Sequence, residues 1–181
     1  QNSEGLTEKV KLIVQFILSA TIAVYLWRLE ETRRLITDVM GPFLKDPVLS
    51  GPSATMIFSW AAVVGVVITV CAIMGSSNAV NFTDGLDGLA VGSVLIVSMV
   101  FYVFTYIAGH AKFAAELYVP AVSGAGELSV VCAGMMGACL GFLWFNCFPA
   151  RVFMGDTGSL ALGGSLGIVA VLIHQPWVLV I

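Results

Sequence analysis

The chain has 181 residues, of which 59% are hydrophobic and only 10% are charged, and its mean hydropathy is +0.98. A soluble domain carries about 25% charged residues, so this composition is that of a membrane protein. The net charge is −3 at pH 7 and no basic patch is present, which excludes nucleic acid as a partner.

Five apolar runs are long enough, or nearly so, to cross a bilayer as helices. A spanning helix needs about 20 apolar residues, because ~1.5 Å of rise per residue must cover ~30 Å of hydrocarbon. The runs lie at about residues 10–27, 54–74, 89–108, 128–148 and 159–173, and residues 177–181 look like the start of a sixth helix. We therefore expect an all-α polytopic transmembrane bundle, forming a single integral-membrane domain over residues 1–181.

The two ends of the chain indicate that this domain is incomplete. The chain begins with Gln1 instead of Met, and it stops inside the apolar stretch "WVLVI". Both features predict a piece of a longer protein.

Two further features bear on the fold, one in a linker and one mostly within the apolar runs. In the first linker, "RLEETRRLITDVM" has apolar residues near helical spacing, which predicts a helix at the membrane interface or an extension of the first run. Small residues recur four apart, and such repeats predict close helix packing: Gly88 and Gly92, Gly137 and Gly141, Gly163 and Gly167.

The stretch "NAVNFTDGLDGLA", residues 78–90, is the first candidate site. Asp84 and Asp87 stand three apart just before an apolar run, so on a helix they would share one face. Helix N-capping would explain one aspartate. It would not explain two, preceded by Asn78 and Asn81 at the same spacing.

The stretch "FPARVFMGDTGS", residues 148–159, is the second candidate site. Asp156 lies between Gly155 and Thr157 at the expected start of a helix, where free N–H groups favour anions. A carboxylate beside an anion site suits Mg²⁺, which binds one or two carboxylates, waters and substrate phosphates. The alternative is that Asp156 is a helix N-cap and that Ser159 completes the turn.

Counting membrane crossings brings the two stretches together. Two expected crossings separate Asp84 and Asp87 from Asp156, so all three carboxylates face the same side, as do Lys9 and Lys11. Of the basic residues, three lie on this side (Lys9, Lys11, Arg151) and five on the other (Arg28, Arg33, Arg34, Lys45, Lys112). Taken alone, the positive-inside rule would put the carboxylates outside the cell.

Other residues near these stretches allow two interpretations each. Phe153 either stacks on a planar ligand or anchors the loop at the interface, and Asn146 either contacts a ligand or ends a helix. Lys9 and Lys11 either bind phosphate or flank the membrane. His110 and His174 lie on the opposite side, and we expect no catalytic role for them. The residues together predict a Mg²⁺-dependent membrane enzyme for phosphoryl or pyrophosphate chemistry on a lipid.

The quoted stretches, with "EGLTEKVKL" near the start and "MGDTGSLALGG" later, closely resemble the signature motifs of the phospho-N-acetylmuramoyl-pentapeptide transferases. The resemblance runs along almost the whole chain. It implies transfer of phospho-MurNAc-pentapeptide from its UDP-linked precursor to undecaprenyl phosphate, which yields lipid I and UMP for peptidoglycan synthesis. It also implies a multi-pass protein of the bacterial cytoplasmic membrane with its active site on the cytoplasmic face, against the basic-residue count.

The resemblance also implies roles for individual residues. Asp84 and Asp87 would line the nucleotide and pyrophosphate pocket, and Asp156 would be the Mg²⁺ ligand. Phe153 would stack on uracil. The remaining implied substrate contacts are Asn78, Asn81, Gly85, Asn146 and Lys9.

The chain lacks two motifs of that family, an Asp-Asp pair expected before Gln1 and a histidine-rich motif expected after Ile181. We therefore expect residues 1–181 alone to be inactive. Phe82 is a smaller departure, since an aliphatic residue is common there in the family. The oligomeric state stays open, a homodimer included.

Three alternatives remain at this stage. A sister transferase would use UDP-N-acetylglucosamine instead. A cation transporter would use its acids as a relay, although it would place them near the middle of the membrane. A structural scaffold would leave the shared carboxylate face unexplained.

Overall fold

The structure, a computed structural model, describes residues 7–40, 47–49 and 60–180. A short strand β1 (Val39–Met40) pairs antiparallel with β2 (Pro47–Leu49). All other regular structure in these ranges is helical. The helices are, in chain order, α1 (Glu8–Arg28), α2 (Glu30–Thr37), α3 (Trp60–Thr83), α4 (Leu89–Ala108), α5 (Ala111–Glu116), α6 (Ala125–Asn146), α7 (Gly155–Leu172) and the 3-10 helix η1 (Pro176–Val180).

Five of these helices are long and apolar enough to cross a membrane: α1, α3, α4, α6 and α7. This confirms the predicted all-α polytopic bundle. The predicted start of a sixth helix is observed as η1, a 3-10 helix, as far as Val180. Residues 54–59 of the expected second run, and Ile181, lie outside the described residues.

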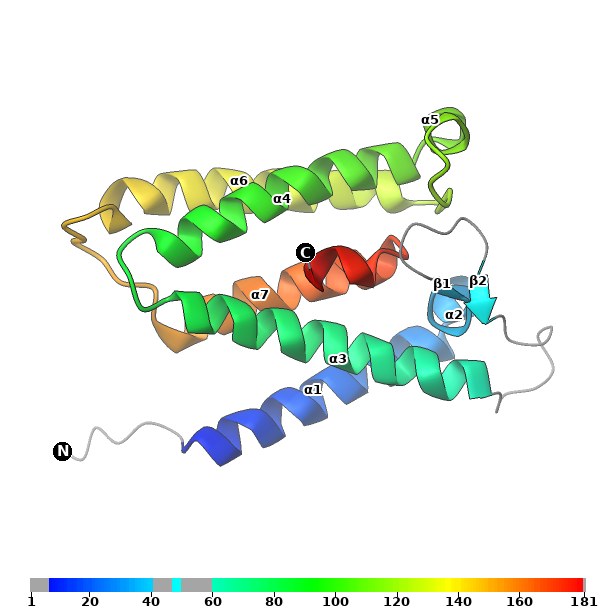
Figure 1. Cartoon of the computed structure of the whole chain (residues 1–181), viewed down its shortest axis with the longest axis horizontal. Coiled ribbons are helices and arrows are strands. Elements are labelled where there is room, and N and C mark those ends of the chain that lie inside the picture. Colours follow the sequence, from blue (N-terminus) through cyan, green and yellow to red (C-terminus); the bar gives the residue numbers. More distant parts are fainter. Residues whose placement is uncertain (1–6, 41–46, 50–59, 181) are drawn as a thin grey trace.

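The spanning helices form two closely packed pairs, α3 with α7 and α4 with α6, and α1 lies along α3 (Figure 1). Between α4 and α6, the buried side chains repeat at helical spacing, with Val94 and Phe101 facing Cys132 and Cys139. Because lipid tails are as apolar as these side chains, such pairs are held by close van der Waals contact rather than by exclusion of water.

Glycine makes the contact between α3 and α7 possible. A Cβ atom on Gly163 would lie 2.7 Å from the Cα of Ser77, and one on Gly167 would lie 2.8 Å from the Cα of Ile73. The two helix backbones therefore approach more closely than any side chain would permit. The predicted role of this glycine pair in close helix packing is confirmed.

The other two glycine pairs do not serve this purpose within the described residues. A Cβ atom on Gly92, Gly137 or Gly141 would meet nothing within 4 Å. Instead, the close approach of α4 and α6 is where α4 ends and α6 begins. A Cβ on Gly109 would lie 2.7 Å from the Cα of Gly126 there.

The substitution Gly163→Ala is expected to destabilise the full-length protein by about 1–3 kcal/mol, the usual cost of overpacking a tight contact. Gly164→Ala is the matched control, because a Cβ at the neighbouring position would meet nothing within 4 Å. Thermal unfolding in detergent measures both. Equal midpoints for the two variants would contradict the close-contact interpretation.

Several helix ends differ from the sequence-based expectation. The second run was expected to end near residue 74, but α3 continues as a helix through Asn78 and Asn81 to Thr83. Similarly, α7 begins at Gly155 instead of residue 159. Hydropathy marks only the part of a helix in hydrocarbon, whereas the last turns in the interface can be polar and still be helical.

The first linker contains a separate helix rather than an extension of α1. Leu29 has an extended backbone, with φ −72° and ψ 129°, and it separates α1 from α2. Ile36 of α2 is 2% exposed and packs on α3 at Gly65. This contact holds α2 against the end of the bundle opposite to the predicted carboxylate face.

Candidate functional site

One end of the bundle gathers the two stretches singled out in the sequence. The loops after α3 and after α6 lie at the end where α1 begins (Figure 1, left). Lys11 on α1 contacts Asp156 on α7, and Ala150 in the second loop contacts Asp87 in the first. The prediction that Asp84, Asp87 and Asp156 lie at the same end of the helix bundle is therefore confirmed.

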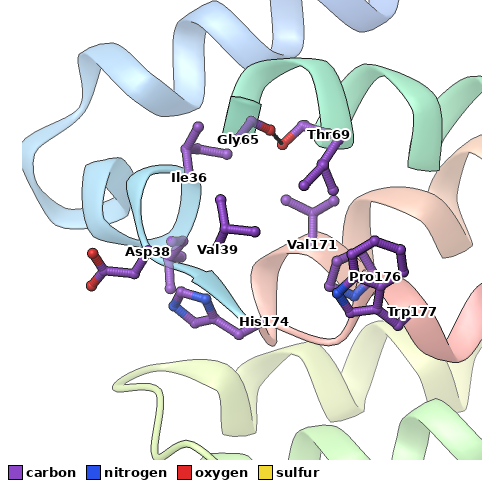
Figure 2. A pocket seen from close by; sticks show the side chains of 11 residues that line it. Ile36, Asp38, Val39, Gly65, Thr69, Val171, His174, Pro176 and Trp177 are labelled. Atoms are coloured by element: carbon purple, nitrogen blue, oxygen red, sulfur yellow. Dashed lines mark hydrogen bonds between the residues drawn. The ribbon is translucent and has the colours of Figure 1, made fainter. Parts of the chain in front are cut away.

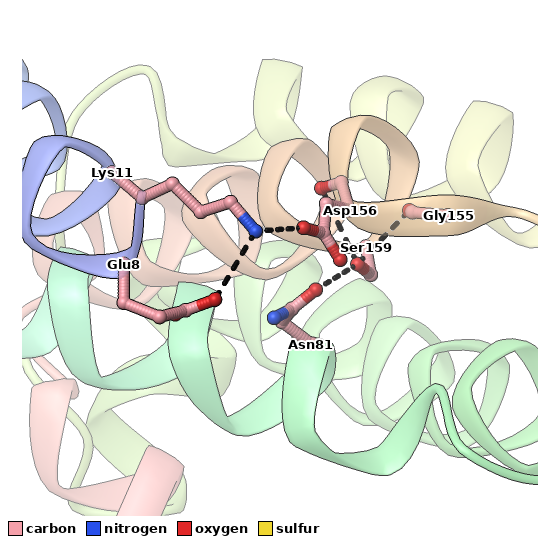
Figure 3. A network of polar contacts seen from close by, with 6 residues as sticks. All are labelled: Glu8, Lys11, Asn81, Gly155, Asp156 and Ser159. Carbon is pink, nitrogen blue, oxygen red and sulfur yellow. Dashed lines mark hydrogen bonds and ion pairs between the residues drawn. The ribbon is translucent and has the colours of Figure 1, made fainter. Parts of the chain in front are cut away.

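Asp156 sits at the centre of a polar network in the first turn of α7 (Figure 3). Its carboxylate forms an ion pair with the ammonium group of Lys11, which also lies 3.5 Å from a carboxylate oxygen of Glu8. The Asp156 side chain is 52% exposed, so water and ligands can reach it. A carboxylate at a helix start is favoured by the positive end of the helix dipole.

Ser159 joins this network to α3. Its hydroxyl donates to the side-chain oxygen of Asn81 at 2.7 Å, and it lies 3.1 Å from the carbonyl oxygen of Gly155 (Figure 3). Ser159 is fully buried. The serine therefore fixes the polar end of α3 against the first turn of α7, which also carries Asp156.

Asn78, one turn before Asn81, faces α1. Its amide nitrogen donates to the side-chain oxygen of Gln15 at 2.6 Å and lies 2.8 Å from the carbonyl oxygen of Met74. The asparagine pair on α3 thus ties this helix to both α1 and α7. Continuation of α3 past residue 74 is what places the two asparagines on one helix face.

The two acids of the first loop differ in their surroundings. Residues 84–88 form turns instead of a helix, so Asp84 and Asp87 do not lie on one helix face. A carboxylate oxygen of Asp87 accepts a hydrogen bond from the backbone N–H of Ala150 at 3.0 Å. Asp84 is half-buried, and its backbone N–H donates to the carbonyl oxygen of Asn81 at 3.2 Å.

Asn146, the last residue of α6, joins the two loops. Its side-chain oxygen accepts from the backbone N–H of Gly88 at 3.1 Å, and its amide nitrogen donates to the carbonyl oxygen of Val152 at 2.8 Å. The residue is 4% exposed. Because both ends of its amide are engaged within the chain, its geometry is that of a positioning residue, and the expected ligand contact stays a prediction.

The remaining candidates lie at the surface of this end. Phe153 is 73% exposed in the second loop, so its ring is free to meet a planar ligand. Gly85 and Lys9 are also exposed. The interpretation of the three aspartates as helix N-caps is wrong, since Gly88 and Met154 occupy those positions and neither helix has a side-chain cap.

The three carboxylates do not form a metal-binding cluster on their own. Within the described ranges, no group of three or more histidine, cysteine, aspartate or glutamate side chains could hold a metal ion. A protein cage for a cation, as for Ca²⁺ or structural Zn²⁺, therefore does not fit this end. A single exposed carboxylate does fit Mg²⁺, which keeps waters and substrate phosphates as its other ligands.

Sequence reasoning missed the partners of the candidate residues. It carried forward Lys9 as the phosphate-facing lysine, but Lys11 is the one that reaches Asp156. It did not identify Gln15, and it named Ser159 only as completing a turn at Asp156, not as a partner of Asn81. Helical spacing could have indicated the two partners on α1 in part, because Lys11 and Gln15 are four residues apart and therefore share a face of α1.

The opposite end contains a small cavity of about 20 Å³ between α2, α3 and the end of α7 (Figure 2). The His174 ring lines it beside Asp38. Burial lowers the pKa of His174 below its usual value, and the nearby Asp38 offsets part of that effect. His174 is half-buried at this end, and the expectation that it has no catalytic role stays a prediction.

This histidine is expected to make stability depend on pH. Because the pKa of His174 is lowered in the folded state, the unfolded chain takes up its proton first, from about pH 6.5 downward. His174 therefore lowers stability as the pH falls through that range. In His174→Asn, which tolerates the positive φ of 58° at this position, the decline in unfolding midpoint between about pH 7 and 5 is expected to be shallower. Identical slopes would contradict this.

Comparisons with known proteins agree with the geometry. Residues 3–174 match the family model described as glycosyl transferase family 4. The chain is 46% identical over 177 residues to the phospho-N-acetylmuramoyl-pentapeptide-transferase of Methylacidiphilum infernorum (isolate V4). That alignment covers 98% of the chain and 46% of the relative, so the chain spans about half the length of the curated relative that it matches.

Proposed function

The chain belongs to glycosyl transferase family 4, and on that premise we propose that the protein transfers phospho-MurNAc-pentapeptide from its UDP-linked precursor to undecaprenyl phosphate. The products are lipid I, for peptidoglycan synthesis, and UMP. The 46% identity to a phospho-N-acetylmuramoyl-pentapeptide-transferase supports this choice of reaction. So do the two motifs that meet at one end of the bundle.

The observation that supports the proposal best is the network around Asp156. One ion pair and one hydrogen bond, Lys11 to Asp156 and Ser159 to Asn81, join α1, α3 and α7 at a membrane-helix end. An exposed carboxylate and a partly exposed ammonium group held together there suit a reaction between a charged soluble donor and a charged lipid head group. A transporter would instead need ionisable groups along the helices.

In the proposed phosphosugar transfer, one P–O bond forms and another breaks. An oxygen of the lipid phosphate attacks the phosphorus next to the sugar, a new P–O bond forms, and the bond from that phosphorus to the bridging oxygen breaks. UMP leaves with that oxygen. In this proposal Lys11 stabilises negative charge on these phosphates. The exposure of the Phe153 ring supports its proposed stacking on the uracil.

Asp156 is the residue we propose as the Mg²⁺ ligand. When bound, Mg²⁺ would neutralise phosphate charge and stabilise the leaving nucleotide. The exposed carboxylate, which belongs to no group of three or more possible metal ligands in the described part of the chain, supports a cation held jointly by protein and substrate. Lys11 would then turn from Asp156 towards the phosphates.

The protein is a multi-pass membrane protein, and we propose the bacterial cytoplasmic membrane as its location with the Asp156 end facing the cytoplasm. The UDP-linked donor is a soluble cytoplasmic compound, so a site that uses it has to open on that side. The basic-residue count opposes this orientation. That count covers only the segments of this chain, and one of its residues, Lys45, lies outside the described ranges.

The test is a competition between two donors. The full-length protein is incubated with undecaprenyl phosphate, Mg²⁺ and equal amounts of UDP-MurNAc-pentapeptide and UDP-N-acetylglucosamine, and the lipid product is identified by mass spectrometry. We expect the muramoyl-pentapeptide lipid alone. A product carrying N-acetylglucosamine would instead assign the protein to the sister branch of transferases.

A further inference from the structure

The first half of α1 turns its polar side chains, rather than its apolar ones, towards the rest of the bundle. The structure describes all of residues 8–18, and among them only Lys11 and Gln15 are partly buried, whereas all the others are exposed. The fully buried side chains of α1 lie further along the helix: Ser19, Ala23 and Leu26. The contact of this first half with the bundle therefore depends on two polar residues.

These two residues bind different helices from the same face of α1. The side-chain oxygen of Gln15 accepts a hydrogen bond from the amide nitrogen of Asn78 on α3 at 2.6 Å. Four residues earlier, the ammonium group of Lys11 forms its ion pair with Asp156 on α7 (Figure 3). Residues four apart lie one above the other on a helix. One orientation of α1 about its axis therefore serves both contacts.

Apolar packing does not select this orientation of α1. Lipid tails are as apolar as side chains, so a membrane helix gains little by turning one apolar face rather than another towards its neighbours. A rotation by a single residue turns each side chain by about 100° and would carry Lys11 away from Asp156. It would also leave the Gln15 amide without its partner in an apolar environment, which is unfavourable. The bond to Asn78 therefore favours the orientation that the ion pair needs.

The ion pair is the weaker of the two constraints on α1. The Asp156 side chain is 52% exposed, and water screens exposed pairs of this kind. In the proposed reaction Lys11 also leaves Asp156 for the substrate phosphates, so the pair is absent when the orientation of α1 matters most. Gln15 and Asn78 are both partly buried and take no part in that exchange. Their bond is able to hold α1 while Lys11 moves.

We propose that Gln15 is a positioning residue for the transfer reaction. Its hydrogen bond to Asn78 fixes the rotation of α1 and thereby keeps Lys11 at the substrate phosphates. Asn78 acts through the same bond and not by touching the substrate. The inference rests on the proposed function, in which Lys11 stabilises phosphate charge. It adds a residue that lies about one helical turn from the charged group and touches no reacting atom.

Chemical labelling of Lys11 tests this link without reference to activity. Gln15→Leu in the full-length protein removes the hydrogen bond and keeps a side chain of similar bulk. Acetylation of Lys11, followed by mass spectrometry, should become about three- to tenfold faster, the effect on an equilibrium of losing one hydrogen bond between membrane helices. The exposed Lys9 is the internal reference, and its rate should stay unchanged.

Thr21→Val is the matched control variant on the same helix. The hydroxyl of Thr21 donates to the carbonyl oxygen of Ile17 within α1 at 2.7 Å, so its loss should leave the contacts with α3 and α7 intact. Labelling of Lys11 in this variant should equal that in the unmodified protein. Unchanged labelling of Lys11 in Gln15→Leu would overturn the proposal.

Steady-state kinetics separate positioning from a general loss of folding. Gln15→Leu should lower kcat, while the KM for the nucleotide donor and the unfolding midpoint stay unchanged. Asn78→Leu should have the same effect, and the double variant should lose no more than either single variant, because both residues act through one bond. Additive losses would overturn the proposal. So would a normal kcat in Gln15→Leu beside a defect in Asn78→Leu, which would make Asn78 a ligand contact.

The two measurements together distinguish failure of this inference from failure of the proposed function. Faster labelling of Lys11 in Gln15→Leu with an unchanged kcat would support the link between the helices, and it would contradict the proposed role of Lys11 in transfer. A lower kcat with unchanged labelling of Lys11 would overturn the positioning role and leave the proposed function intact.

Discussion

Asp156→Asn in the full-length protein is expected to lower the rate of phosphosugar transfer by at least about 100-fold, the usual effect of removing a group that stabilises charge in a transition state. Asparagine keeps the shape of the side chain but removes the charge that pairs with Lys11 and that would bind Mg²⁺. The rate is measured over a series of Mg²⁺ concentrations. The remaining activity should depend less steeply on Mg²⁺ than that of the unmodified protein.

Glu8→Gln provides the matched control for this substitution. Glu8 is the second carboxylate near Lys11, at 3.5 Å, but its side chain is 87% exposed and lies on the same helix as the lysine. Exposed ion pairs of this kind contribute little, so transfer should change less than about twofold. Near-normal turnover in Asp156→Asn, with an unchanged Mg²⁺ dependence, would show that Asp156 is not the metal ligand.

Asn146→Ala is expected to reduce kcat by on the order of 100-fold, because small displacements of reacting groups have effects of that size. The substitution removes the hydrogen bonds that link Gly88 to Val152 through one buried amide. Two backbone groups then lose their partner, which should also lower stability by about 1–3 kcal/mol. Steady-state kinetics and thermal unfolding of the full-length protein measure both effects.

A direct ligand contact predicts a different pattern for Asn146. If its amide bound the substrate, Asn146→Ala would mainly raise the KM for the nucleotide donor and would leave the fold unaffected. Asn146→Asp separates the two bonds, because it keeps the acceptor for the N–H of Gly88 and loses the donor to Val152. We expect an intermediate kcat for this variant. Unchanged kcat in Asn146→Ala would contradict the positioning role.

Much of the fold could be predicted because it depends on hydropathy. The five spanning helices correspond to five apolar runs, and counting crossings was enough to bring Asp87 and Asp156 to the same end. Helix ends were harder to predict. The polar last turns of α3 are stabilised by contacts with α1 and α7, such as Asn78 with Gln15, and these depend on residues more than 60 positions away.

The sequence could single out candidate residues of the site, but it could not predict their hydrogen-bond partners. The sequence indicates that Asp84, Asp87, Asn146 and Asp156 are unusual for their positions. It does not indicate which backbone groups they bind, because Asn146 bonds to Gly88 and Asp87 bonds to Ala150, and these partners lie 58 and 63 positions away in the sequence. Glycine repeats were similarly ambiguous. Only the pair on α7 meets another helix backbone within the described residues.

The identity of the released nucleotide is the most direct test of the central claim, which is that this end of the bundle catalyses phosphosugar transfer to a lipid phosphate. The full-length protein is given its UDP-linked donor, undecaprenyl phosphate and Mg²⁺, and the soluble products are separated by chromatography. We expect UMP in equal amount to the lipid-linked product, and none when the lipid phosphate is omitted. Release of UDP would mean that the sugar is transferred without its phosphate, and would contradict the mechanism.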